Sequence, residues 1–151
     1  MLRDYALLAD GCRGALVGPR GDVCWLCAPS WDSPAVLSHL IGGDSLFAVT
    51  PLDPFVWGGT YEPRSLIWHT TFVTTSTRLE CRDALAFPGD PHRVVLLRRV
   101  GAPEAGTTVR VVLRPAGGFG SLPAAEPHQE ADDRWSVQVG GLTMRLTGPR
   151  Q

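Results

Sequence analysis

Short runs of β-branched and aromatic residues, each bounded by glycine, proline or small polar residues, recur along most of this 151-residue chain. Because 17 residues are glycine and 13 are proline, long helices have little room. Short strands at close spacing are typical of an antiparallel sandwich or barrel rather than a βαβ fold. We therefore predict an all-β fold, an antiparallel β-sandwich or an incomplete supersandwich, as a single domain over residues 1–151. The predicted strands lie at 45–50, 65–75, 77–87, 93–100, 107–115, 134–139 and 142–147.

Two hairpins are predicted from their turns. The segments 15–17 and 23–27 flank a Gly-Pro-Arg-Gly-Asp turn, and a Gly-Gly pair at 140–141 separates the last two strands. The stretch 116–133 is rich in glycine, proline and acidic residues, and it is predicted to be a long loop.

One short helix is predicted near residues 33–42. Ser33 suits its N-cap, Pro34 fits its first turn, and Gly42 with the following glycine ends it. The apolar stripe of this helix would consist of Val36, Leu37, Leu40 and Ile41.

Charge and hydropathy exclude several partners. The formal net charge of −1 gives no electrostatic reason to expect nucleic acid or an anionic membrane. No apolar run approaches the roughly 20 residues of a membrane span, and Asp4 and Asp10 interrupt any signal-peptide core. Four cysteines do not make a disulfide scaffold in a chain of this size. We expect a cytoplasmic protein with reduced thiols that binds neither nucleic acid nor membrane.

Cys24 and Cys27 form a C-x-x-C motif that could indicate zinc or thiol redox chemistry. On a strand these side chains would point to opposite faces, with Cα atoms about 10 Å apart, whereas a disulfide needs less than about 7 Å. Cys12 and Cys81 do not supply a second pair of ligands, and the four histidines show no paired spacing. We predict buried, reduced, structural cysteines, no metal and no cofactor.

Common catalytic motifs are missing from the sequence. It contains no G-x-S-x-G, no P-loop and no strand-linked G-x-G-x-x-G. Arg93, Arg98 and Arg99 surround an apolar strand, and they are predicted to form a solvated edge or face that discourages edge pairing.

Trp25, Trp31 and Asp32 are the candidate substrate-edge residues. Tryptophan offers a flat apolar face suited to a sugar ring, and a neighbouring carboxylate can accept hydrogen bonds from hydroxyl groups. The alternative is structural: Trp25 would belong to the core, and Asp32 would help to cap the predicted helix.

The segment "DYALLADGCRGALVGPRGDVCWLCAPSWDSPAVLSHLIGG" resembles the opening of family 15 glycoside hydrolases, the bacterial and archaeal glucoamylase and trehalase group. A later segment, "YEPRSLIWHTTFVTTSTRLECRDALAF", is similar to a second stretch of that family. Four positions depart from the family pattern: Cys24 replaces an aspartate, Ser30-Trp31 replaces Arg-Phe, and Phe119 stands in a usual D-Y-G context. The residues that match the opening pattern are Asp4, Tyr5, Ala15, Leu16, Val17, Gly21, Trp25, Leu26, Cys27, Pro29, Asp32, Ser33, Pro34 and Gly42.

The resemblance implies an N-terminal β-sandwich that precedes a catalytic α/α barrel, where one carboxylic acid and one carboxylate hydrolyse an α-glucoside with inversion. Such a pair needs its carboxyl groups roughly 6.5–9.5 Å apart. No helix-rich segment follows residue 43, and the 15 acidic residues are scattered over predicted strands and turns. We therefore expect no catalytic residue in this chain, which would support and edge the active site of a trehalase or glucoamylase. Its partners would be the barrel and, weakly, trehalose or another α-glucoside.

Two alternatives remain open from the sequence: an independent carbohydrate-binding module, and a truncated remnant that self-associates. Because the sequence ends at "LTGPRQ", we expect an unpaired sheet edge and a partly uncovered apolar face. Trp57, Trp68, Phe72 and Trp135 are expected near that face. A two-fold homodimer would cover it.

Overall fold

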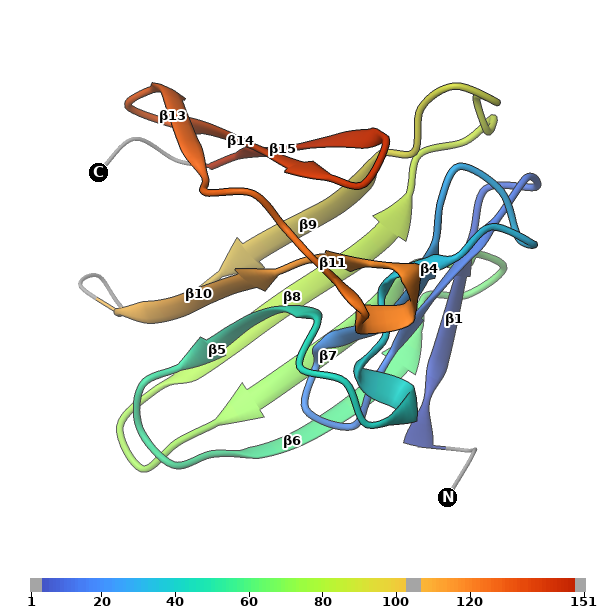
Figure 1. The fold of residues 1–151 in the computed structure, drawn as a ribbon. Helices are drawn as coiled ribbons and strands as arrows, with labels where there is room; N and C mark the ends of the chain where they lie inside the picture. The colour runs from blue at the N-terminus through green and yellow to red at the C-terminus, as the bar shows by residue number, and fades with distance from the viewer. Residues whose placement is uncertain (1–3, 103–106, 149–151) are drawn as a thin grey trace.

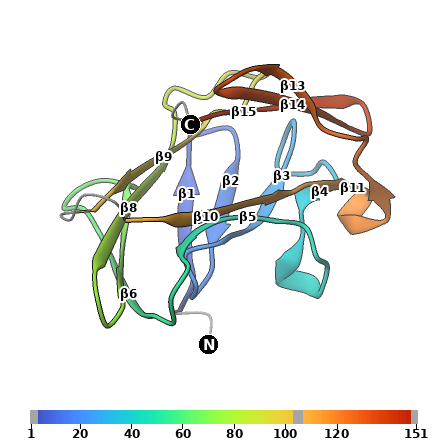
Figure 2. The same ribbon diagram turned by 90° about the vertical axis from the view of Figure 1, so that its left-hand side faces the viewer.

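The computed structural model describes residues 4–102 and 107–148, so the last residues of the "LTGPRQ" segment lie outside the described part. The chain forms antiparallel sheets and no α-helix over that part, which confirms the predicted all-β fold (Figure 1). Two large sheets face each other, and a three-stranded sheet lies across one end of the pair (Figure 2).

The first sheet has the strand order β1-β2-β3-β5-β10, with β4 paired to β3. The second sheet has the order β6-β7-β8-β9, the third sheet has the order β13-β14-β15, and a small ribbon pairs β11 with β12. The first sheet comprises β1 (Ala6–Ala9), β2 (Gly14–Val17), β3 (Val23–Cys27), β4 (Ala35–Leu37), β5 (Leu46–Pro51) and β10 (Val109–Arg114). The second comprises β6 (Val56–Tyr61), β7 (Trp68–Val73), β8 (Arg78–Leu85) and β9 (Leu96–Gly101). The remaining elements are η2 (His39–Ile41), β11 (Ala116–Gly117), η3 (Gly118–Gly120), β12 (Leu122–Pro123), β13 (His128–Ala131), β14 (Arg134–Val139) and β15 (Leu142–Thr147).

The core fills the space between the sheets because side chains alternate between the two faces of each strand. Leu8, Ala15 and Leu26 lie opposite one another across β1, β2 and β3, and all three are buried in the main core cluster. Phe72 and Leu79 form a second buried cluster from β7 and β8. The third sheet adds its own apolar face through Val137 and Val139 of β14.

Both predicted hairpins are present. β2 pairs with β3 across the Gly-Pro-Arg-Gly-Asp turn, and β14 pairs with β15 across the Gly-Gly turn. Gly21 in the first turn has φ of +71°, and an added Cβ would lie 2.5 Å from the ring of Phe72. Glycine is therefore required there, both for the backbone conformation and for the close approach.

The predicted helix at 33–42 is wrong. Residues 35–37 form strand β4 against β3, and only a single 3-10 turn follows at η2. Ala35, Val36 and Leu37 are all buried, whereas Leu40 and Ile41 are exposed. A helix would bury one stripe along its whole length, but here burial is confined to four consecutive residues, 35–38, which suits a short strand that is buried on both faces.

The predicted long loop at 116–133 is also wrong in part, because it contains β11, η3, β12 and β13. Two further strands escaped prediction: β1, and β6 with its two adjacent glycines. All six residues of β6 are exposed, so its sequence lacks the apolar alternation on which strand prediction depends.

Arg98 does not belong to a solvated edge. Its side chain is 4% exposed, and its Nε lies 2.5 Å from Oδ1 of Asp83, which is fully buried. Arg93 and Arg99 are exposed, as predicted.

Of the four aromatic residues expected beside an uncovered face, Phe72 is fully buried and Trp68 packs against the core. Trp57 is exposed on β6 at one edge of the second sheet. Trp135 lines a cleft beside the opposite edge.

Candidate functional site

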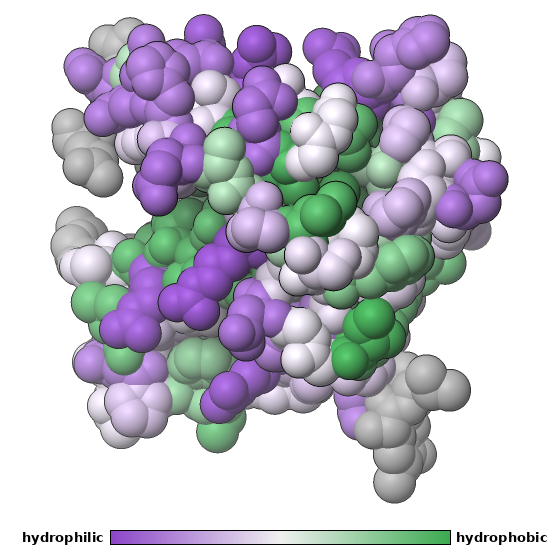
Figure 3. All heavy atoms as spheres, in the orientation of Figure 1, coloured by the Kyte–Doolittle hydropathy of each residue, from purple (hydrophilic) through white to green (hydrophobic). Residues whose placement is uncertain are grey.

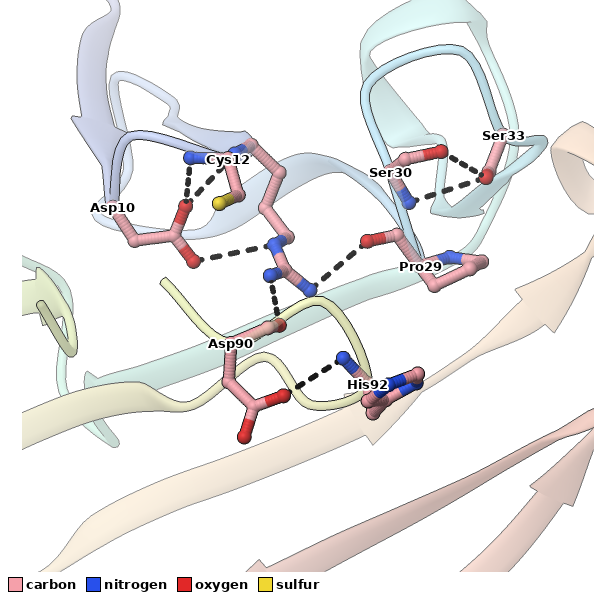
Figure 4. A network of polar contacts seen from close by, with 8 residues as sticks. Asp10, Cys12, Pro29, Ser30, Ser33, Asp90 and His92 are labelled. Atoms are coloured by element: carbon pink, nitrogen blue, oxygen red, sulfur yellow. Dashed lines mark hydrogen bonds and ion pairs between the residues drawn. The ribbon is translucent and has the colours of Figure 1, made fainter. Parts of the chain in front are cut away.

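Three loops at one end of the sandwich meet at the buried side chain of Arg13 (Figure 4). Its Nη1 donates to the carbonyl oxygen of Pro29 at 2.9 Å, its Nη2 donates to the carbonyl of Asp90, and its Nε lies 3.2 Å from Oδ2 of Asp10. A buried guanidinium is costly unless it has a countercharge and hydrogen-bond acceptors. Since each of the three loops supplies one of these groups, Arg13 holds the loops together.

Asp10 closes the turn between β1 and β2 from the same network. Its Oδ1 accepts hydrogen bonds from the backbone N–H groups of Cys12 and Arg13, both at 2.8 Å, and its carbonyl accepts one from Gly89 at 2.9 Å. Asp90 similarly accepts the backbone N–H of His92 at 2.8 Å (Figure 4). Because Arg13 also donates to the carbonyl of Pro29, the loop that follows Pro29 is anchored to the same network at its first residue.

Trp31 lies on this loop, and its indole covers Gly14 of β2. A Cβ added to Gly14 would lie 2.2 Å from Cη2 of Trp31 and 2.9 Å from the side chain of Leu7. Trp31 is nevertheless 52% exposed, so one part of the ring packs on the sheet while the rest remains open to solvent. Trp31 is therefore a partly exposed surface residue and not a core residue.

Trp25 is only half-buried, which corrects its assignment to the core. It pairs with Leu16, which pairs with Leu7, and this row alternates with the buried row of Leu8, Ala15 and Leu26. Trp25 therefore faces outward from the first sheet. Gly14 and Leu16 share that face, so the two tryptophans lie over the same outer surface.

Phe119 covers Trp25, with ring centroids 6.1 Å apart and planes inclined by 30°. Phe119 is 50% exposed and has φ of +60°. Its only signal in the sequence was its place in a family pattern where tyrosine is usual. Phe87, 81% exposed, also escaped prediction, although it lies beside Gly11 at the same end of the sandwich.

Asp32 does not cap a helix. Its Oδ1 accepts a hydrogen bond from the Ser30 hydroxyl at 2.5 Å, and this bond lowers the pKa of the exposed carboxyl group. Ser33 also bonds within the loop, since its Oγ accepts the backbone N–H of Ser30 at 3.2 Å. The outcome is an ionised carboxylate beside Trp31 in sequence, available as an acceptor for hydroxyl groups.

The cysteines differ in exposure. Cys24 and Cys27 are buried and free, as predicted from their strand, and Cys81 is buried and free as well, whereas Cys12 is free but exposed. Burial raises the pKa of Cys24 to about 12 and that of Cys81 to about 11. Within residues 4–102 and 107–148, no group of three or more His, Cys, Asp or Glu side chains could hold a metal ion. No helix over the same residues is long and apolar enough to cross a bilayer.

Comparison with known proteins identifies the family. The sequence model described as "Trehalase-like, N-terminal" matches residues 2–146. A trehalase of Mycobacterium tuberculosis is 38% identical over 86 residues, and a trehalase of Mycolicibacterium smegmatis is 37% identical over 86 residues. Each match covers 56% of this chain and 13% of the relative, so the matched part is a small fraction of those enzymes. No solved structure matches. The chain belongs to the trehalase-like N-terminal domain family.

Proposed function

We propose that this chain is a noncatalytic β-sandwich domain of a trehalase-type hydrolase that cleaves α-glucosides with inversion. It would pack against a catalytic α/α barrel and edge the active site. The family match over residues 2–146 carries this proposal. The two trehalase relatives favour trehalose over an α-glucan as the substrate of the complete enzyme.

The outer face of the first sheet supports a role at the edge of a sugar site. Trp31 offers an exposed indole held on Gly14, and Asp32 offers an ionised carboxylate on the same loop. Trp25 lies on the same face of the sheet beneath Phe119. A flat aromatic surface with a nearby acceptor is suited to a sugar ring. The Arg13 network fixes the start of the loop that carries Trp31 and Asp32.

We also propose that the protein is cytoplasmic. Free thiols at Cys24, Cys27 and Cys81, all buried, are compatible with a reducing compartment.

The test is kinetic and uses the complete hydrolase that carries this domain. Trp31→Ala is expected to raise KM for trehalose, because the indole would contact substrate without taking part in bond cleavage. Trp57→Ala is the matched control, since Trp57 is also a partly exposed tryptophan but lies on β6 of the second sheet. If Trp31→Ala leaves both kcat and KM unchanged, the role at the substrate edge is wrong.

The exposed Trp31 also favours a second candidate, an independent carbohydrate-binding module. One wall of a pocket can supply only weak affinity, on the order of millimolar or about −4 kcal/mol. Titration of the chain alone with trehalose distinguishes the two functions. Binding tighter than this limit, and lost in Trp31→Ala, would favour the module.

A further inference from the structure

The sandwich is open along one side, between the edge strands β9 and β10. A cleft of about 930 Å³ lies there, bounded by these two strands and by the apolar face of the β14–β15 hairpin. Val49, Val109, Leu113, Trp135 and Met144 contribute to its lining. In the space-filling view, a hollow with a hydrophobic floor separates the third sheet from β10 (Figure 3).

Side chains that should be buried in a closed sandwich are exposed in this cleft. Val100 of β9 shares the inward face of its strand with the buried Arg98, yet it is 39% exposed. Val111 of β10 pairs with the buried Val49, yet it is 52% exposed. Both valines line the cleft, and the described residues leave them partly uncovered on the open side.

Both strands also end their sheets. Among the described residues, β9 pairs only with β8 and β10 pairs only with β5, so each strand has one hydrogen-bonding side without a strand partner. The opposite side of the sandwich is different. There the Tyr61 hydroxyl of β6 accepts the N–H of Leu7 at 2.6 Å and donates to the carbonyl of Leu7 at 3.1 Å, which occupies the edge of β1.

The charges along β9 and β10 indicate which kind of partner could bind in the cleft. β9 and β10 contain four arginines and no acidic residue. Arg98 is paired with Asp83, but Arg99, Arg110 and Arg114 are exposed and form no ion pair with another described residue. A second copy of this chain would bring the same arginines to the interface, so like charges oppose a homodimer at this edge. An acidic segment would be attracted.

We propose that the cleft binds an extended polypeptide segment in which apolar and acidic residues alternate, and that this segment adds as a strand to β9 or β10. Its apolar side chains would cover Val100 and Val111, and its acidic side chains would face the arginines. Backbone pairing supplies affinity in such strand addition, and alternate side chains supply specificity. Under the proposed function, on which this source depends, the segment would belong to the rest of the hydrolase.

The test uses short synthetic peptides and the 151-residue chain, so it does not depend on trehalase activity. A fluorescein-labelled peptide of alternating valine and glutamate is expected to bind, as measured by anisotropy. Replacing the glutamates by lysines is expected to weaken binding about tenfold or more through charge repulsion. A proline at the central position is expected to weaken it similarly, because proline removes a backbone donor from the new strand.

Val111→Asp should also abolish most binding of the Val/Glu peptide, since it places a carboxylate in the apolar cleft. The matched control is Val56→Asp, a change at an exposed valine on the other edge strand, β6, and it should leave binding unchanged. Equal binding of the lysine or proline peptide would overturn the proposal. So would a monodisperse dimer in sedimentation, which would assign the cleft to a second copy, or binding of decanoate without binding of any peptide, which would assign it to a small amphiphile.

Discussion

The guanidinium of Arg98 and the carboxylate of Asp83 form an ion pair inside the sandwich, with Nε 2.5 Å from Oδ1 and Nη2 3.0 Å from Oδ2. Arg98 also donates to the carbonyl of Gly21 at 2.7 Å and lies over the ring of Phe47, 5.0 Å from its centroid. Asp83 and Arg98 belong to the second sheet, whereas Phe47 and the turn of Gly21 belong to the first. One side chain therefore links the two layers.

Asp83→Asn tests this link. It removes the countercharge and leaves the Arg98 guanidinium buried without one, so we expect a loss of about 3–5 kcal/mol in the free energy of unfolding. Glu62→Gln is the control, because it breaks the more exposed pair with Arg82 and should cost no more than about 1 kcal/mol. Urea denaturation measures both. Equal effects of the two substitutions would show that the buried pair does not join the sheets.

Gly14→Ala tests the packing of the Trp31 indole on Gly14. The new Cβ would overlap the indole, so the ring must move off β2, and we expect a loss of about 1–3 kcal/mol together with a shift in tryptophan emission. Gly58→Ala is the control, since a Cβ at that strand position meets no atom within 4 Å. The free energy of unfolding of this variant should stay the same or rise by up to about 1 kcal/mol, because alanine loses less backbone entropy than glycine when a strand forms. An unchanged emission spectrum in Gly14→Ala would contradict the packing of Trp31 on this strand.

The buried thiols predict a decline in stability at high pH. Burial raises the pKa of Cys24 from 9.0 to about 12 and that of Cys81 from 9.0 to about 11. In the unfolded chain both thiols ionise near pH 9, whereas in the folded protein they stay protonated up to their raised pKa values. The free energy of unfolding is therefore unaffected by these thiols below pH 9 and falls as the pH rises from 9 toward the folded-state pKa values. Each thiol lowers the free energy of unfolding by about 1.4 kcal/mol per pH unit over that window.

Urea denaturation at pH 7 to 10.5 measures this slope, and Cys24→Ala should reduce it. Cys12→Ala is the control, because Cys12 is exposed. In the folded protein, a thiol reagent at neutral pH should modify Cys12 alone, with the others reacting only after unfolding. Rapid modification of Cys24 or Cys81 in the native state would contradict their burial.

Strand prediction succeeded where apolar residues alternate regularly. The ranges 134–139 and 142–147 agree with β14 and β15, because each strand has one apolar face and a Gly-Gly turn joins them. It failed for β6, whose residues are all exposed, and for residues 33–42, whose apolar spacing fits a helix although burial stops after Ser38. The spacing of apolar residues along a segment does not show how much of that segment is covered by the rest of the fold.

The candidate site was harder to predict than the strands, because it is built from contacts between segments that are far apart in sequence. Arg13 meets Pro29 and Asp90, and Arg98 meets Gly21, all far apart in sequence, so no local pattern distinguished these buried arginines from surface ones. The sequence singled out Trp31, but only the structure shows that it rests on Gly14 with about half of its surface exposed.

The central proposal, a noncatalytic domain of a trehalase-type hydrolase, is tested most directly by assaying the purified 151-residue chain for glucose release from trehalose. We predict no release above a protein-free blank, because inverting hydrolysis needs two carboxyl groups placed across a substrate pocket. Glucose release by the wild-type chain that disappears in Asp32→Asn would contradict the proposal and show that the chain itself carries a catalytic acid.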